Sequence, residues 1–329
     1  MMLITQLSRM LVSHGCSRCI NSRLPSTLRW FSSTTVNSSI YQLKSRGLVQ
    51  VKGRDTIPFL QGLVTSDVES LGTVMAAQYS MLLTVQGRVM YDLILYDVSD
   101  SLGESAILIE CDRGMTDQLI SDIKKYKIRK KVAIENVSDT QTVYASIPSD
   151  TNIVNTSSIM IQTPDPRVHQ FGQRIISTST ELSNDNEVED ESSYHEQRMI
   201  WGISEGPNDL PPGTCFPLES NLVYMNGVSF SKGCYLGQEL TARTHHTGVT
   251  RKRIMPLVFE KPPGVIDPGE NIKNSDNNKN VGKFRSISGL YGLGLMRVTE
   301  LSERLTIVNK AQEIIKLKAV IPKWWPDTS

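Results

Sequence analysis

The sequence contains no uninterrupted apolar run of about 18 residues, the minimum that a membrane-spanning helix needs. Cysteine is also scarce: there are 5 in 329 residues, and an odd number without regular spacing excludes a disulfide-rich fold. Aromatic residues make up 6% of the chain, whereas 39% of its residues are hydrophobic and 21% are charged. These proportions exclude collagen, coiled-coil and disordered chains. They are typical of a globular protein with two or three packed domains.

Acidic residues are missing from the beginning of the chain, because the first is Asp55 and eight basic residues precede it. When these eight are set aside, the 35 basic residues fall to 27, against 34 acidic ones, so the remaining body is mildly acidic. An acidic body disfavours binding to the phosphate backbone of DNA or RNA. We therefore expect neither a nucleic-acid partner nor, without an apolar span, a membrane partner.

The first 40 residues resemble a mitochondrial presequence. They contain Arg but no acid, are rich in Ser and Thr, and begin with a stretch that can form a positive amphipathic helix. The run Arg29-Trp30-Phe31-Ser32 resembles a matrix-processing site. We predict a presequence over residues 1–31, a mature protein beginning near Ser32, and a location in the mitochondrial matrix. The alternative is a disordered basic tail, which a mature N-terminus at Met1 would favour.

The mature chain alternates short strand-like runs with helices. Helices are expected from Asp55 onward and over residues 115–126, where the apolar residues recur on one face. The expected strands are residues 48–53, 78–83, 89–98, 106–110 and 132–134. Because Thr84-Val85-Gln86-Gly87 separates two of these runs, they predict a hairpin. The pattern indicates an α+β, ferredoxin-like unit and not a parallel doubly wound sheet.

Composition also suggests the domain boundaries. Residues 181–196 carry seven acids and few apolar residues, which predicts a solvated loop or linker, and residues 271–280 form a second polar patch. Towards the C-terminus, short apolar runs separated by Pro and Gly predict a small antiparallel barrel. The expected parts are an N-terminal extension at 32–45, an α+β core at 46–250 with subunits of about 46–140 and 141–250, and the barrel at 251–329.

The segment 232–248, KGCYLGQELTARTHHTG, has the character of a Gly-containing turn that leads into a helix. Cys234 would then lie near a helix N-terminus, where backbone N–H groups favour a thiolate, and Lys232 could favour it further. Glu239 and Arg243 are spaced to pair on one helical face. A cysteine between glycines is nevertheless more often a buried small residue than a ligand, so the residues by themselves leave both interpretations open.

Other chemistries have little support. His245 and His246 are adjacent, and on a helix their side chains point about 100° apart, which favours packing or capping over metal binding. The run 289–294, GLYGLG, has the wrong glycine order for a dinucleotide loop. The sequence also lacks a phosphate-binding P-loop, an H-E-x-x-H zinc motif and a serine nucleophile elbow.

The run 232–239, KGCYLGQE, resembles the K-G-C-[FY]-x-G-Q-E signature of the Iba57/Caf17 iron–sulfur assembly family and the related bacterial YgfZ group, with no departure. The resemblance extends over nearly the whole mature chain. Departures are Ser66, where relatives usually carry Asn, and the two polar insertions at 181–196 and 271–280. The other matching segments are Ser45–Gly47, Phe59–Thr65, Gln86–Val89, Gly202–Gly206, Pro217–Asn221 and Gly292–Leu295.

This family is similar to the glycine-cleavage T-protein, a folate-dependent aminomethyltransferase. The similarity implies an α+β fold in which a ring of ferredoxin-like units and a C-terminal antiparallel β-barrel surround a tetrahydrofolate-type pocket. The pocket residues that it implies are Asp92, Glu205, Arg88 and Asn221. The carboxylate of Glu205 is suited to accept two N–H bonds from the guanidine-like edge of a pterin. In the simpler interpretation, Asp92 is a strand residue and Glu205 a turn residue.

The resemblance also implies an accessory factor, rather than a turnover enzyme, that works with A-type iron–sulfur carriers to mature [4Fe–4S] targets of the aconitase and lipoate-synthase, radical-SAM types. Thiolates hold such clusters, and one exposed cysteine is insufficient. Neither Cys111 nor Cys215 has ligand spacing with Cys234. We therefore expect Cys234 to bind a [2Fe–2S] or [4Fe–4S] cluster shared with a partner, with Lys232, Glu239 and Arg243 in support.

Two alternatives remain open at this point. One is a tetrahydrofolate-dependent aminomethyl or one-carbon transferase, which would require Asp92 and not Cys234. The other is a scaffold that uses neither site, in which the KGCYLGQE turn only packs domains together.

Overall fold

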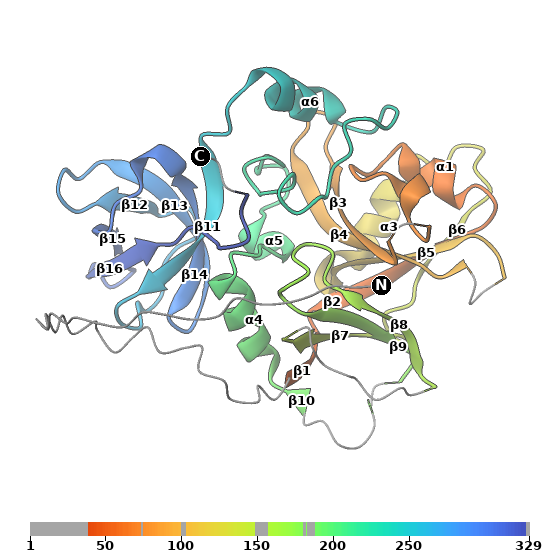
Figure 1. The fold of residues 1–329 in the computed structure, drawn as a ribbon, viewed down its shortest axis with the longest axis horizontal. Helices are drawn as coiled ribbons and strands as arrows, with labels where there is room; N and C mark the ends of the chain where they lie inside the picture. The colour runs from red at the N-terminus through yellow and green to blue at the C-terminus, as the bar shows by residue number, and fades with distance from the viewer. Residues whose placement is uncertain are drawn as a thin grey trace, which may run out of the picture. The chain divides into compact units, whose positions relative to one another are not determined.

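The computed structural model of the chain describes residues 39–73, 75–99, 103–148, 157–179, 182 and 188–326. The predicted presequence and its cleavage site lie outside these residues. The described part contains two five-stranded sheets and a closed six-stranded barrel (Figure 1).

The first sheet has the strand order β3-β4-β5-β2-β6 and is antiparallel throughout. Helices α1 (Thr56–Gln61) and α3 (Thr116–Lys124) cover it, with Phe59, Leu60, Leu119 and Ile123 buried against its strands. The hairpin predicted around residues 84–87 is confirmed by the pairing of β3 with β4. The strands are β2 (Arg46–Lys52), β3 (Ala77–Leu83), β4 (Val89–Asp97), β5 (Ala106–Asp112) and β6 (Ala133–Asn136).

The second sheet has the order β10-β1-β7-β9-β8 and was not foreseen from the sequence. The prediction of a solvated linker over 181–196 is wrong for its described end, because Asp190 caps α4 (Glu191–Ile200) by accepting a hydrogen bond from the backbone of Ser192. Tyr194 then gives that helix a buried face. The strands are β1 (Ser39–Gln42), β7 (Thr142–Ile147), β8 (Ile159–Pro164), β9 (Gln173–Ser177) and β10 (Val188–Glu189).

The third layer is a closed antiparallel barrel with its own apolar core, as predicted. Its order is β11-β14-β13-β12-β15-β16. The polar patch at 271–280 contains β12 and the turn into β13, so part of it belongs to the barrel wall. The strands are β11 (Lys252–Phe259), β12 (Asn271–Asn274), β13 (Asn280–Ser288), β14 (Tyr291–Arg297), β15 (Leu305–Val308) and β16 (Ile314–Ala319).

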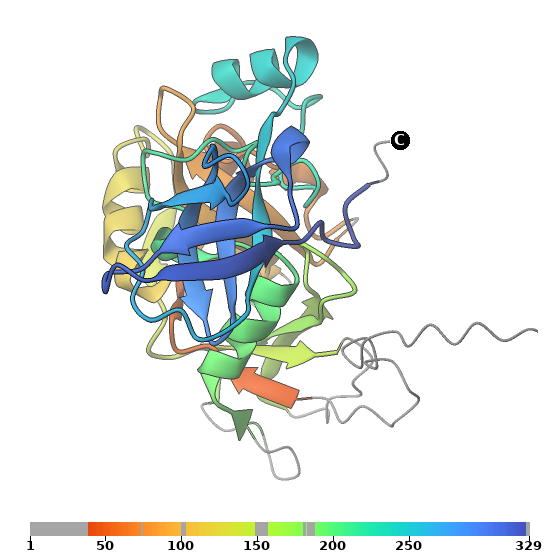
Figure 2. The ribbon, with the colours of Figure 1, turned by 90° about the vertical axis from the view of Figure 1, so that its left-hand side faces the viewer.

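Two helices lie at the junction of the barrel with the two sheets (Figure 1). Helix α4 packs on β11, β13, β14 and β1, and the short α5 (Gly206–Asp209) contacts β13, β4 and β5. Helix α6 (Gln238–Thr247), in contrast, lies beyond the ends of β3 and β4 in both views (Figures 1 and 2). No helix among the described residues is long and apolar enough to cross a membrane.

Candidate functional sites

Cys234 lies in the turn that precedes α6, and its side chain is exposed. The other two cysteines of the described residues, Cys111 and Cys215, are buried. Burial raises the pKa of the Cys111 thiol to about 12 and also raises the pKa of Cys215. Both buried thiols are therefore neutral and out of reach, and Cys234 is the thiol that this part of the chain presents to solvent.

Lys232 anchors the Cys234 turn to the segment between α1 and β3. Its ammonium donates hydrogen bonds to the backbone oxygens of Val64, at 2.9 Å, and Ser66, at 2.6 Å. The backbone N–H of Ser229 donates to the oxygen of Thr65 at 3.0 Å. The side chain expected to support a thiolate is thus directed into the protein, and burial lowers the pKa of Lys232 to about 8.

Gly237 brings the other end of the turn against the β3–β4 hairpin. It adopts the left-handed conformation, with φ of 75°, and a Cβ atom there would lie 2.2 Å from the backbone oxygen of Thr84. The neighbouring Leu236 donates its N–H to Gly62. The turn is therefore held from two sides. One side is the segment Phe59–Thr65 together with Ser66, and the other is the β3–β4 hairpin at Thr84 and Gly87. In the sequence these appeared as separate motifs.

Replacing Gly237 by Ala should lower the free energy of unfolding by about 1–3 kcal/mol, because the new methyl group is strained by the positive φ and collides with a backbone oxygen. Gly233→Ala is the matched control in the same turn, since a Cβ at Gly233 meets nothing within 4 Å. Urea denaturation of the two variants measures the difference. Equal stabilities would show that the turn does not depend on this close approach.

Helix α6 is weakly packed, and Thr241 is its buried residue. Glu239 and Arg243, expected to pair on its surface, form no ion pair in the described structure. The ring of His245 stacks on Phe230, with centroids 3.8 Å apart, so the packing interpretation of the histidine pair is confirmed. Across the described residues there is no group of three or more His, Cys, Asp or Glu side chains that could hold a metal ion.

A second candidate site is a cavity of about 230 Å³ at the junction of the first sheet, α4, α5 and β13, which we call the central cavity. Its lining includes Ser45, Arg46, His195, Glu205 and Ser286. These residues come from distant parts of the sequence, and four of the lining residues are charged: Arg46, Asp112, Arg198 and Glu205. The cavity is therefore a polar site built around buried charge.

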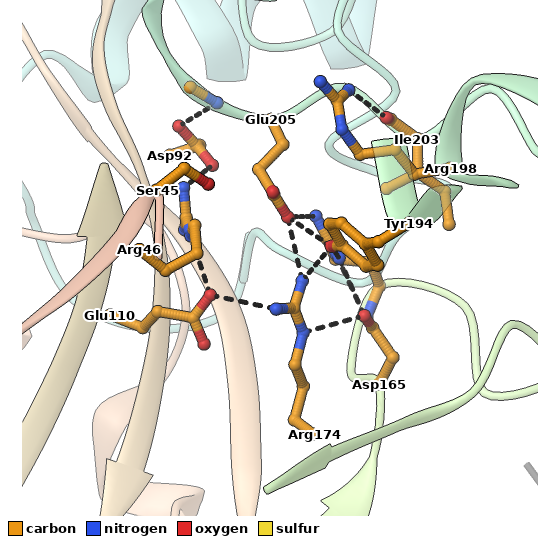
Figure 3. A network of polar contacts seen from close by, with 12 residues as sticks. Ser45, Arg46, Asp92, Glu110, Asp165, Arg174, Tyr194, Arg198, Ile203 and Glu205 are labelled. Carbon is orange, nitrogen blue, oxygen red and sulfur yellow. Dashed lines mark hydrogen bonds and ion pairs between the residues drawn. The ribbon is translucent and has the colours of Figure 1, made fainter. Parts of the chain in front are cut away.

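Glu205 is the centre of a buried network of arginines (Figure 3). Its Oε2 accepts hydrogen bonds from Arg167 at 2.7 Å, Arg174 at 2.8 Å and the hydroxyl of Tyr194 at 2.7 Å. Arg174 also lies 3.3 Å from Glu110. Burial opposes ionisation of Glu205, but the surrounding guanidinium groups outweigh it and hold the pKa of Glu205 well below its ordinary value.

Asp92 and Arg46 lie beside this network and keep unsatisfied polar atoms. Asp92 Oδ1 accepts a hydrogen bond from the N–H of Gly206 at 3.0 Å, while Oδ2 lies 3.5 Å from Arg46. Arg46 Nε donates to Glu110. Asp92 Oδ2 and both terminal nitrogens of Arg46 are buried without a hydrogen-bond partner among the described residues. Burial raises the pKa of Asp92, although the charge of Arg46 opposes the shift.

The structure separates the four residues expected in a folate-type pocket. Asp92 and Glu205 lie close to each other, because Gly206, which follows Glu205 in the sequence, donates its N–H to Asp92. Arg88 instead donates to the backbone oxygen of Thr214 and lies over the ring of Phe216. The side chain of Asn221 is buried and donates to the backbone of Ile254 in the barrel.

Sequence reasoning missed most of the buried network, namely Asp165, Arg167, Arg174 and Tyr194. Arg46 carried a signal, because it lies in one of the segments that match the family. The sequence around Arg167 and Arg174 gave no such signal. Nothing in their spacing distinguishes them from surface arginines, and only the fold shows that they are buried.

Lowering the pH below about 6.5 should destabilise the protein through His195, which lines the central cavity. Burial, followed by the charge of Arg198, lowers the pKa of His195 below its ordinary value of 6.5. Between the two pKa values the unfolded chain binds a proton that the folded chain does not, so the free energy of unfolding falls with pH.

The variant His195→Gln should lose this part of the pH dependence, and His169→Gln is the control because His169 is exposed. The measurement is denaturation at several pH values between 7 and 5. A slope unchanged by His195→Gln would contradict the assignment.

The chain is similar over most of its length to proteins of known family. Residues 251–327 match the family model described as "CAF17, C-terminal beta-barrel domain". The chain is 39% identical to the iron-sulfur cluster assembly factor IBA57, mitochondrial, of Mus musculus, covering 87% of this chain and 85% of the relative. It is 38% identical to the human protein of the same name, covering 88% and 86%.

A solved structure shares the fold. The glycine cleavage system aminomethyltransferase T of Bartonella henselae superposes with a TM-score of 0.66 at 16% identity, covering 87% of this chain and 86% of the other. At that identity the likeness concerns the fold alone. It confirms the expected fold class, an α+β, T-protein-like arrangement with a C-terminal antiparallel barrel.

Proposed function

The chain belongs to the IBA57 family of iron–sulfur cluster assembly factors, and on that premise we propose that it supports the maturation of [4Fe–4S] proteins through the thiol of Cys234. Its relatives are named as mitochondrial, which supports a role in mitochondrial iron–sulfur cluster assembly. The proposed compartment is the matrix, on the strength of the presequence predicted over residues 1–31. The proposed partners are A-type iron–sulfur carriers and apo [4Fe–4S] targets.

The observation that carries this proposal is the single exposed thiol. Within the described residues, Cys111 and Cys215 are buried and no cluster of other ligand side chains accompanies Cys234. An iron–sulfur cluster needs several thiolate ligands. The proposed arrangement is therefore a [2Fe–2S] or [4Fe–4S] cluster, handled as cargo, for which Cys234 supplies one ligand and the carrier supplies the others.

The central cavity fits part of a tetrahydrofolate. Asp92 and Arg46 carry atoms without a hydrogen bond, which offer an acceptor and donors, and among described residues no group donates to Oε1 of Glu205. The resemblance implies that both carboxylate oxygens of Glu205 accept N–H bonds from a pterin. Because Oε2 already accepts three hydrogen bonds, only Oε1 is available for such a contact. The volume of about 230 Å³ lies below the roughly 300–1,000 Å³ usual for ligand sites, which suits a pterin ring better than the whole cofactor.

A folate-dependent transferase remains the competing function, because the fold is shared with an aminomethyltransferase and Asp92 keeps a buried oxygen without a hydrogen bond. The two functions differ in the residue that they need. Cluster sharing depends on Cys234, whereas folate chemistry depends on Asp92.

The experiment that tests the proposal mixes the purified protein with an A-type carrier reconstituted with a [2Fe–2S] cluster. We expect a complex that elutes as one species and keeps the visible absorbance of the cluster. Cys234→Ser should abolish the cluster-bearing complex, and Asp92→Asn should leave it intact.

Titration of the same samples with tetrahydrofolate separates the alternatives. Folate binding that Asp92→Asn removes, together with cluster sharing that Cys234→Ser does not affect, would replace the assembly role with the transferase role.

A further inference from the structure

A larger cavity, of about 810 Å³, lies where the end of α6 meets β11 and the C-terminal segment 321–326. We call it the tail cavity. Its lining includes Tyr224, Arg251, Arg253 and Trp325, and it is separate from the residues that line the central cavity. None of the proposed roles of Cys234 or of the central cavity accounts for it.

The tail cavity is positively charged. Arg251 and Arg253 line it, and none of the described lining residues is a carboxylate. Basic side chains gathered without an acid favour an anionic occupant, because the field of the cavity attracts the opposite charge. The charge of the lining therefore favours an acidic occupant over a basic or a neutral one.

Arg253 is the central cation of the tail cavity. Its guanidinium lies 3.8 Å from the ring centroid of Tyr224 and 5.7 Å from that of Trp325. One terminal nitrogen donates to the backbone oxygen of Leu218 at 3.1 Å, and no carboxylate of the described chain pairs with it. Burial lowers the pKa of Arg253, and the neighbouring Tyr224 opposes the shift. Arginine and aromatic residues held in this way are typical centres of binding surfaces.

The rim of the tail cavity carries exposed apolar side chains beside Arg251. Val249 is 79% exposed and Ile321 is 56% exposed, and both line the cavity. Exposed apolar side chains next to an arginine and aromatic rings are typical of a protein interface rather than of an enclosed small-molecule site. The occupant is therefore expected to be a polypeptide that combines acidic and apolar side chains.

One residue connects the tail cavity to the loop that carries Cys234. His245 lines the cavity and stacks on Phe230, which lies in the same loop as Cys234. A partner that places a ligand on the thiol can therefore reach the cavity along α6.

We propose that the tail cavity docks an acidic, apolar-containing segment of the protein that shares the cluster with Cys234. The proposal rests on the proposed function and adds the surface that orients the partner. Carboxylates of the segment face Arg251 and Arg253, and its apolar side chains cover Val249 and Ile321.

The test is the double variant Val249→Asp/Arg251→Glu, which places two negative charges on the rim. The matched control is Ile314→Asp/Lys316→Glu on β16, which also alters an exposed apolar residue and an exposed lysine two positions later, outside the cavity. Affinity for the cluster-loaded A-type carrier is measured by calorimetry at low and high salt. We expect at least about tenfold weaker binding for the rim variant, with a smaller salt dependence, and wild-type affinity for the control.

Wild-type affinity of the rim variant would overturn the docking surface, while cluster sharing that still depends on Cys234 would leave the proposed function standing. A second probe needs no carrier: the hexapeptide acetyl-DEFDEL-amide, with acetyl-KKFKKL-amide as its control. The acidic peptide should shift the indole N–H signal of Trp325, whose nitrogen has no hydrogen-bond partner among the described residues. An unshifted signal, or an equal shift with the lysine peptide, would also overturn the proposal.

Discussion

Cells that lack their own counterpart and receive Cys234→Ser should show mitochondrial aconitase activity no higher than cells that receive no protein. Aconitase-type enzymes need a [4Fe–4S] cluster, and the variant removes the one exposed thiol of the described chain. Hydroxyl oxygen is a poor substitute for thiolate as an iron ligand. The expected loss of function is at least about tenfold, the lower limit reported even for residues that only support a metal ligand.

The control for this experiment is Ser231→Ala, which changes another exposed side chain of the same turn. It should restore aconitase activity fully at matched protein levels. A third arm, Asp92→Asn, tests the central cavity. If Asp92→Asn fails and Cys234→Ser restores activity, the central cavity carries the function and Cys234 is a structural thiol.

Arg174→Met should lower the free energy of unfolding by about 3–5 kcal/mol, the cost of breaking a buried ion pair from one side. Arg174 is fully buried, and it pairs with Glu205, Asp165 and Glu110. Without it, three buried carboxylates lose a cationic partner, although Arg167 still contacts two of them. Methionine keeps an unbranched apolar stem but lacks the guanidinium group, so the main effect is the loss of the buried charge and its hydrogen bonds.

Guanidinium chloride denaturation measures this effect, and Arg304→Met is the matched control. Arg304 also pairs with an acid, Asp276, but both side chains are largely exposed. Exposed pairs contribute about 0–1 kcal/mol, so the control should differ little from the wild type. Similar stabilities for the two variants would show that solvent screens the buried network, contrary to its burial in the structure.

The sequence predicted those elements in which one face is apolar and the other is polar. Helix α3 follows such a pattern, whereas the β3–β4 hairpin, whose strands are buried almost throughout, was predicted from the turn residues 84–87 between two β-forming runs. The second sheet does not follow such a pattern, because β9 buries Arg174 and Ser177 alongside its apolar residues and so hides the alternation. A buried arginine resembles a surface arginine until the carboxylates that surround it are known.

The Cys234 turn is a second case in which the sequence predicted the local structure but not the contacts between distant residues. The motif indicated the turn and the helix, because glycine and helix-forming residues act over a few positions. The role of Lys232 depends on Val64 and Ser66, which lie 168 and 166 positions away along the chain. No local pattern encodes such a contact, so sequence reasoning assigned this lysine to its neighbour Cys234.

The weak packing of α6 has a consequence for binding. Thr241 is the buried residue of this helix, so few contacts hold it in place when the protein is alone. A partner that contacts both the Cys234 turn and the tail cavity immobilises α6, and that ordering opposes association through lost conformational entropy. We therefore expect the affinity of such a complex to be lower than its contact area suggests, so that a bound partner dissociates readily.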